Sequence, residues 1–176
     1  MTRLRIAGAF LSALALFAIP ASPSIAGAAD PEPPSGCEST TGYSKDGSLS
    51  GKLTICFTEE KKYSPTKGEQ MAPAVSVKGE CRRKTLLTWS EQGSCKWTGD
   101  LSMKKDGVQQ WKERWGKATG ATHTGDRTIR GHYQCRGSGT YTLTLDNIDM
   151  KSSNGGIVGV WEPVHPKPVI LTAKGC

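Results

Sequence analysis

Apolar and polar residues alternate most regularly over residues 94–103. The residues of one parity there are apolar or small, and those of the other are mostly polar: Cys95, Trp97, Gly99, Leu101 and Met103 against Ser94, Lys96, Thr98, Asp100 and Ser102. A period of two is typical of a strand with one buried and one solvated face. The following Asp106-Gly107 predicts a hairpin turn, because glycine takes a positive φ without steric cost.

The segment that returns from this turn, 108–117, is ambiguous. Val108, Trp111 and Trp115 fall at helical spacing, whereas Trp111 and Trp115 also share strand parity. The preceding Asp-Gly turn favours a strand, with a helix as the alternative.

Shorter alternating stretches recur along the rest of the chain, separated by Gly-, Pro- and Asn-rich turns. They cover residues 52–58, 74–82, 85–90, 127–136, 140–146, 157–162 and 169–173. This pattern predicts an all-β protein, an antiparallel sandwich or barrel of about nine short strands. Parity places Trp89, Trp97 and Trp161 in the core. The segment 59–73 is predicted to be a long loop, because it holds Pro65, Gly68 and Pro73 among many charges.

Six cysteines predict a disulfide-stabilised fold made in an oxidising compartment. Six cysteines can pair in 15 ways. We favour neighbours along the chain: Cys37 with Cys56, Cys81 with Cys95, and Cys135 with Cys176. Cys81 and Cys95 lie on the apolar parity of their strands, so this bridge is expected inside the core.

The first 29 residues have the pattern of a secretory signal peptide. Arg3 and Arg5 precede an apolar run that Pro20 ends, and small residues follow. Residues 30–40 are predicted to be a flexible, proline-rich N-terminal arm, in which Pro31, Pro33 and Pro34 are candidate binding residues that order on meeting a partner. Residues 41–176 are predicted to form a single all-β domain. The mature protein is expected to be secreted and free of the membrane.

The net charge and the positions of the histidines exclude few classes of function, but neither indicates a catalytic one. The formal net charge is +7, and about +5 without the predicted signal peptide, but the basic pairs are scattered, so nucleic acid is not an expected partner. His123, His132 and His165 lie in no recognisable catalytic context, and no cysteine pattern suggests a metal site. We therefore expect no enzyme activity, cofactor or metal.

Five tryptophans are the strongest sign of binding. Trp111 and Trp115, flanked by Lys112 and Arg114, are predicted to form an exposed aromatic patch about 13 Å long, from about 3.3 Å per strand residue. The leading interpretation is a secreted, non-enzymatic module that recognises an extracellular protein partner, as an adaptor or accessory subunit of a toxin or defence assembly.

Two alternatives remain open at this level. The first is a carbohydrate-binding module, in which exposed tryptophans stack on a glycan. The second is a protease inhibitor that presents residues 67–73 as a proline-stiffened loop.

Overall fold

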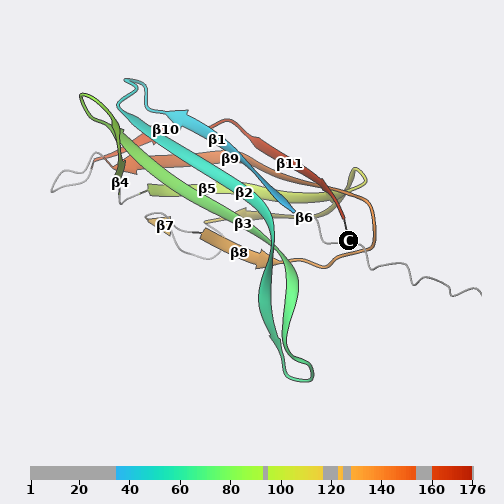
Figure 1. Cartoon of the computed structure of the whole chain (residues 1–176). Helices are drawn as coiled ribbons and strands as arrows, with labels where there is room; N and C mark the ends of the chain where they lie inside the picture. The colour runs from blue at the N-terminus through green and yellow to red at the C-terminus, as the bar shows by residue number, and fades with distance from the viewer. Residues whose placement is uncertain (1–34, 93–94, 117–122, 125–127, 154–159, 176) are drawn as a thin grey trace, which may run out of the picture.

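The computed structural model describes residues 35–92, 95–116, 123–124, 128–153 and 160–175. Within these ranges every regular element is a strand, and the strands form two antiparallel sheets (Figure 1). The described strands do not close into a barrel, and the sandwich is the arrangement observed. The same ranges contain no helix with the length and apolar character needed to cross a membrane.

The first sheet is built around two long strands. β1 (Gly36–Tyr43) pairs with β2 (Leu49–Ser64), and β2 pairs with β3 (Gly68–Lys84). Two short strands share the far edge of β3: β4 (Trp89–Gln92) pairs with residues 81–84, and β8 (Thr128–His132) with residues 74–78.

The second sheet is built around β5 (Cys95–Lys105) and β9 (Thr140–Ser153). β6 (Val108–Trp115) and β7 (His123–Thr124) pair with β5 along one edge. β10 (Trp161–Val164) and β11 (Val169–Lys174) pair with β9 along the other.

Alternation in the sequence predicts the core faces of the long strands correctly. The inward residues of the two sheets form one buried cluster, which includes Leu53, Ile55, Phe57, Val75, Val77, Trp97, Leu101, Met103, Tyr141, Leu143 and Leu145. Each of these side chains is almost fully removed from solvent. The period of two held because each strand buries only one face.

The two sheets approach closely where Trp97 of β5 packs over Gly79 of β3. A Cβ at Gly79 would overlap the Trp97 indole, so only glycine leaves room for this ring. Close by, the buried Cys81–Cys95 disulfide joins β3 to β5, with Cα atoms 5.7 Å apart. This predicted bridge thus links the two sheets covalently.

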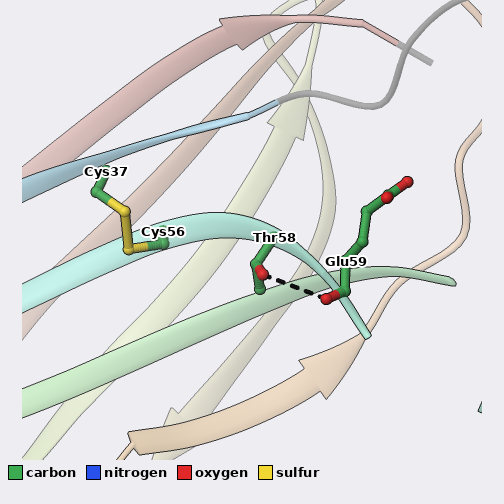
Figure 2. The surroundings of a disulfide bond; sticks show 4 residues. All are labelled: Cys37, Cys56, Thr58 and Glu59. Atoms are coloured by element: carbon green, nitrogen blue, oxygen red, sulfur yellow. Dashed lines mark hydrogen bonds between the residues drawn. A yellow bond between two sulfur atoms is a disulfide. The ribbon is translucent and has the colours of Figure 1, made fainter. Parts of the chain in front are cut away.

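The second disulfide lies within the first sheet. Cys37 and Cys56 face each other across β1 and β2, with Cα atoms 4.1 Å apart (Figure 2). The pairing of β1 ends at Phe57, and just beyond it the Thr58 hydroxyl donates to the Glu59 carbonyl at 3.4 Å. None of the described cysteines is a free thiol. Cys176, the partner expected for Cys135, lies outside the described residues.

Residues 59–73 were predicted to be a loop, and this is wrong. Glu59 pairs with Pro73, and the pairing continues to Ser64 and Gly68, so β2 and β3 run on as a two-stranded ribbon. This projecting ribbon, residues 59–73, extends beyond the sandwich in Figure 1. Its composition resembles that of a loop because both of its faces meet water, which removes the alternation that marks a half-buried strand.

Further expectations from the sequence also need correction. Several strands are long, β3 having 17 residues, rather than uniformly short. Residues 36–40 of the expected arm belong to β1, because the Cys37–Cys56 bridge holds them on β2. Residues 85–88 form a turn rather than a strand, and Trp89 is 38% exposed. Residues 108–115 are a strand, so the helical alternative is wrong.

The inter-sheet disulfide yields a stability prediction. Replacing Cys81 and Cys95 together with Ala should lower the free energy of unfolding by more than about 3 kcal/mol, because the cost of a cavity in the core adds to the chain-entropy value for a loop of this size. Denaturant titration under oxidising conditions measures it. The matched variant, Cys37 and Cys56 both replaced with Ala, should lose less, because Cys37 is exposed and its removal leaves no core cavity. The reverse order would contradict this assignment of roles.

Candidate ligand-binding cleft

An open cleft of about 380 Å³ lies where the free edges of the two sheets meet. β6 forms one side and β8 with the segment after it the other, while Val75 and Met103 lie at the base. The remaining lining residues are Gln110, Trp111, Glu113, Trp115, Gly131, His132, Tyr133, Gln134 and Arg136. We call this the tryptophan cleft. Its position follows from the topology, since both lining strands are edges that no further described strand covers.

A β-bulge in β6 decides which side chains reach the cleft. Met103 pairs with Trp111 but the next residue, Lys104, pairs with Gln109, which leaves Gln110 as the extra residue. A bulge of this kind shifts side-chain parity by one. Gln110 therefore lines the cleft, whereas strict alternation from Trp111 would have assigned Gln109 to that face.

The two predicted tryptophans do lie in the same cleft, but they are not equivalent. Trp111 is only partly buried and packs against the core cluster. Trp115 is only 8% exposed, and a Cβ at Gly131 of β8 would lie 3.1 Å from its ring. The expectation of two exposed rings is thus wrong for Trp115, because a strand of the other sheet covers it. Trp111 is the ring available to a ligand.

Lys112 and Arg114 lie on the opposite face of β6 and do not flank the cleft. Arg114 donates to the Asp100 carboxylate and the Asn147 carbonyl, both at 2.9 Å, and to the Thr98 hydroxyl at 3.0 Å. Lys112 lies 3.7 Å from Asp100 and 3.9 Å from Asp146. These two cations serve the outer surface of the second sheet.

Asp100 is the centre of that outer network. Its carboxylate accepts from the Asn147 amide at 2.8 Å and from Arg114. These hydrogen bonds, the Asn147 contact first, hold the pKa of Asp100 below its usual value, against a small opposing effect of burial. Asp100 therefore remains ionised through the physiological range.

The far wall of the cleft is anchored by the backbone. The Tyr133 amide donates to the Pro73 carbonyl at 3.1 Å. Three residues on, the Arg136 amide donates to the Tyr141 hydroxyl at 3.1 Å, and that hydroxyl donates to the Gly137 carbonyl at 2.9 Å. The segment after β8 is thus fixed to the core, and a prepared wall lowers the entropy cost of binding.

Tyr133 is a structural residue of the cleft wall, and its hydroxyl is not available to a ligand. Its hydroxyl is buried and has no hydrogen-bond partner among the described residues. Burial raises the pKa of this phenol well above its ordinary value, with Tyr141 and Glu59 adding to the effect. The phenol therefore stays neutral and inaccessible at physiological pH.

Four polar side chains of the cleft are free to bind. In the described part of the chain, the side chains of Glu113, His132, Gln134 and Arg136 make no hydrogen bond or ion pair. They comprise one carboxylate, one imidazole, one amide and one guanidinium, so neither charge sign dominates. The described residues contain no cluster of His, Cys, Asp and Glu fit to hold a metal ion.

Two other predicted binding segments remain to be placed. Pro31, Pro33 and Pro34 are outside the described residues. Of the predicted inhibitor segment 67–73, Lys67 lies in the turn of the projecting ribbon and the remainder lies in β3. That segment is paired with β2 along its length, so it is not the independent loop that the sequence suggested.

Comparison with known proteins found no matching family model, no matching curated protein and no matching solved structure.

The contacts of Arg114 in the outer network give a prediction about stability, which does not involve the cleft. Arg114→Ala should lower the free energy of unfolding by about 1 kcal/mol at neutral pH, because it removes a charge-assisted bond at a partly exposed site. Lys112→Ala, the matched control with longer contacts, should cost less than about 0.5 kcal/mol.

The pH dependence of the Arg114→Ala effect follows from Asp100. A carboxylate with a lowered pKa in the folded state stabilises the fold above its unfolded pKa, and this contribution is lost as pH falls through the folded value. The difference between parent and Arg114→Ala should therefore shrink in acid, as measured by urea titration at a series of pH values. A difference that grows in acid would contradict this role of Asp100.

Proposed function

We propose that this protein is a secreted, non-enzymatic binding module whose ligand site is the tryptophan cleft, and that the ligand is a glycan chain. The observation that carries the proposal is the combination of the Trp111 ring with unpaired polar side chains around one open cleft. An indole offers an apolar face to a sugar ring, while carboxylate, amide and guanidinium groups hydrogen-bond to hydroxyls.

The charge of the cleft supports an uncharged, hydroxyl-rich ligand. Glu113 and Arg136 offset each other, and the amides of Gln110 and Gln134 both donate and accept. A strongly anionic or cationic ligand would leave one of the two charges opposed to it.

Two features support binding without turnover. Glycoside hydrolysis ordinarily needs two carboxylates on either side of the bond, and Glu113 is the one carboxylate among the residues lining the cleft. Asp146 does not line the cleft and lies beside Lys112 on the outer face. The two disulfides of this small all-β fold are compatible with an extracellular location, which supports the secretion proposed from the first 29 residues.

Retention on insoluble polysaccharides tests the glycan proposal. Trp111→Ala should reduce retention by about tenfold or more, since stacked aromatic anchors contribute most of the affinity at such sites. Trp89→Ala is the matched control, because it removes an exposed ring far from the cleft and should leave retention unchanged. The proposal fails if the parent binds no polysaccharide, or if Trp111→Ala binds as tightly as the parent.

A second candidate function is recognition of an extracellular protein, the role that the sequence first suggested. The projecting ribbon favours it. Tyr63 and Met71 lie on the side of the ribbon that continues the core face of β2 and β3, yet they are 73% and 58% exposed. Exposed apolar side chains on a paired, projecting element are typical of a protein contact.

Affinity capture from culture medium tests the ribbon. Tyr63→Ser with Met71→Ser should abolish capture of a specific partner, because it removes the apolar contact area. The matched control, Lys62→Ser with Gln70→Ser, changes the same number of residues on the opposite face. Equal capture by both variants would overturn this candidate.

A further inference from the structure

A four-residue turn at one end of β3 exposes two leucines. Leu86 is fully exposed and Leu87 is 93% exposed, so neither side chain packs against the fold. The turn, residues 85–88, lies at the upper left of Figure 1, at the opposite end of β3 from the projecting ribbon. We call it the leucine turn. Two adjacent leucines held in water stabilise nothing within the described fold, so only another surface could bury these side chains.

Hydrogen bonds between Thr85 and Thr88 pair the polar groups at the two ends of the leucine turn. The Thr85 amide and hydroxyl both donate to the Thr88 carbonyl at 2.7 Å, and the Thr88 amide donates back to the Thr85 hydroxyl at 3.1 Å. Polar groups entering hydrocarbon must be paired, because an unpaired one costs several kcal/mol there. The leucines can therefore enter an apolar phase while the polar groups of Thr85 and Thr88 are already hydrogen-bonded to each other.

An aromatic and basic hollow lies beside the turn on the outer face of the first sheet. The rings of Tyr43 and Trp89 approach to 6.0 Å between centroids. Together with the cations of Lys52 and Arg82 and the hydroxyls of Thr41 and Ser50, they line a hollow of about 210 Å³. Cations and hydroxyl donors are what a phosphate or carboxylate group requires.

The charge around the leucine turn is positive overall. Over residues 82–92 three cations, Arg82, Arg83 and Lys84, stand against the single acid Glu91, a net charge of +2. The neighbouring β1–β2 turn adds one charge of each sign, Lys45 and Asp46. Glu80 lies close to Lys52 and Arg82 but is bonded to Lys78 at 2.6 Å.

We propose that this end of the sandwich docks on an anionic lipid bilayer. Leu86 and Leu87 enter the acyl boundary, Tyr43 and Trp89 lie at the headgroup level that such rings prefer, and Lys52 and Arg82 bind a headgroup phosphate or carboxylate. A protein partner is the less favoured occupant, since the leucines project from a convex turn rather than lining a groove. This departs from the expectation, drawn from the pattern of the first 29 residues, that the mature protein is free of the membrane.

Vesicle flotation of the mature protein tests the proposal. The protein should float with vesicles made of equal parts phosphatidylserine and phosphatidylcholine, and not with phosphatidylcholine alone. Leu86→Ser with Leu87→Ser should weaken binding about tenfold or more, because two apolar side chains no longer leave water. Lys52→Gln and Arg82→Gln should each weaken it about fivefold at low salt.

The controls make each outcome decisive. Val108→Ser with Ile170→Ser removes two other exposed apolar residues and should bind like the parent. Since Leu86 and Leu87 have no packing role, their variant should unfold at the same denaturant concentration as the parent. The proposal is overturned if the parent fails to float with anionic vesicles, or if the leucine variant floats equally well. It is also overturned if a soluble protein is captured through the leucines while vesicles are not.

Discussion

The contact between the inner faces of the two sheets is the constraint on which the structure depends. At one close approach Trp97 fills the space that Gly79 leaves open, and the Cys81–Cys95 bridge ties the same two strands together. A sandwich that buries one face of each sheet must leave its edges partly uncovered. The tryptophan cleft is such an edge, where β6 and β8 come from different sheets and cannot pair along their length.

β3 links the candidate surfaces in order along one element. Its first residues, from Gly68, form the projecting ribbon, the next pair with β8 beside the cleft, Cys81 holds the other sheet, and Lys84 leads into the leucine turn. At about 3.3 Å per residue, its 17 residues span about 56 Å. A strand this long carries both ends past the core, so side chains there must meet either water or a partner.

Alternation along the sequence correctly predicted the features that depend only on neighbouring residues, namely which face of each strand is buried. The inward parity of Leu53, Val77 and Leu143 was correct because a half-buried strand keeps a period of two. The burial of Trp115 was missed because it depends on Gly131, which is distant in sequence and belongs to the other sheet. The placement of Gln110 was missed because one bulge changes the parity of every residue beyond it. Pairing of Cys81 with Cys95 was accessible from sequence, since both lie on core parity in strands close along the chain.

The same dependence on strands distant along the chain explains why the function is harder to predict from the sequence than the fold. The sequence holds only weak signs of these two surfaces. The cleft of mixed charge corresponds to a few scattered polar residues, and the leucine turn to a Leu-Leu pair that resembles a core strand. Their meaning comes from exposure, which depends on strands far away in the chain. Leu86 and Leu143 are the same residue in similar local sequence, yet one is fully exposed and the other fully buried. A hydrophobic residue becomes evidence for binding only once the fold has been shown to leave it uncovered.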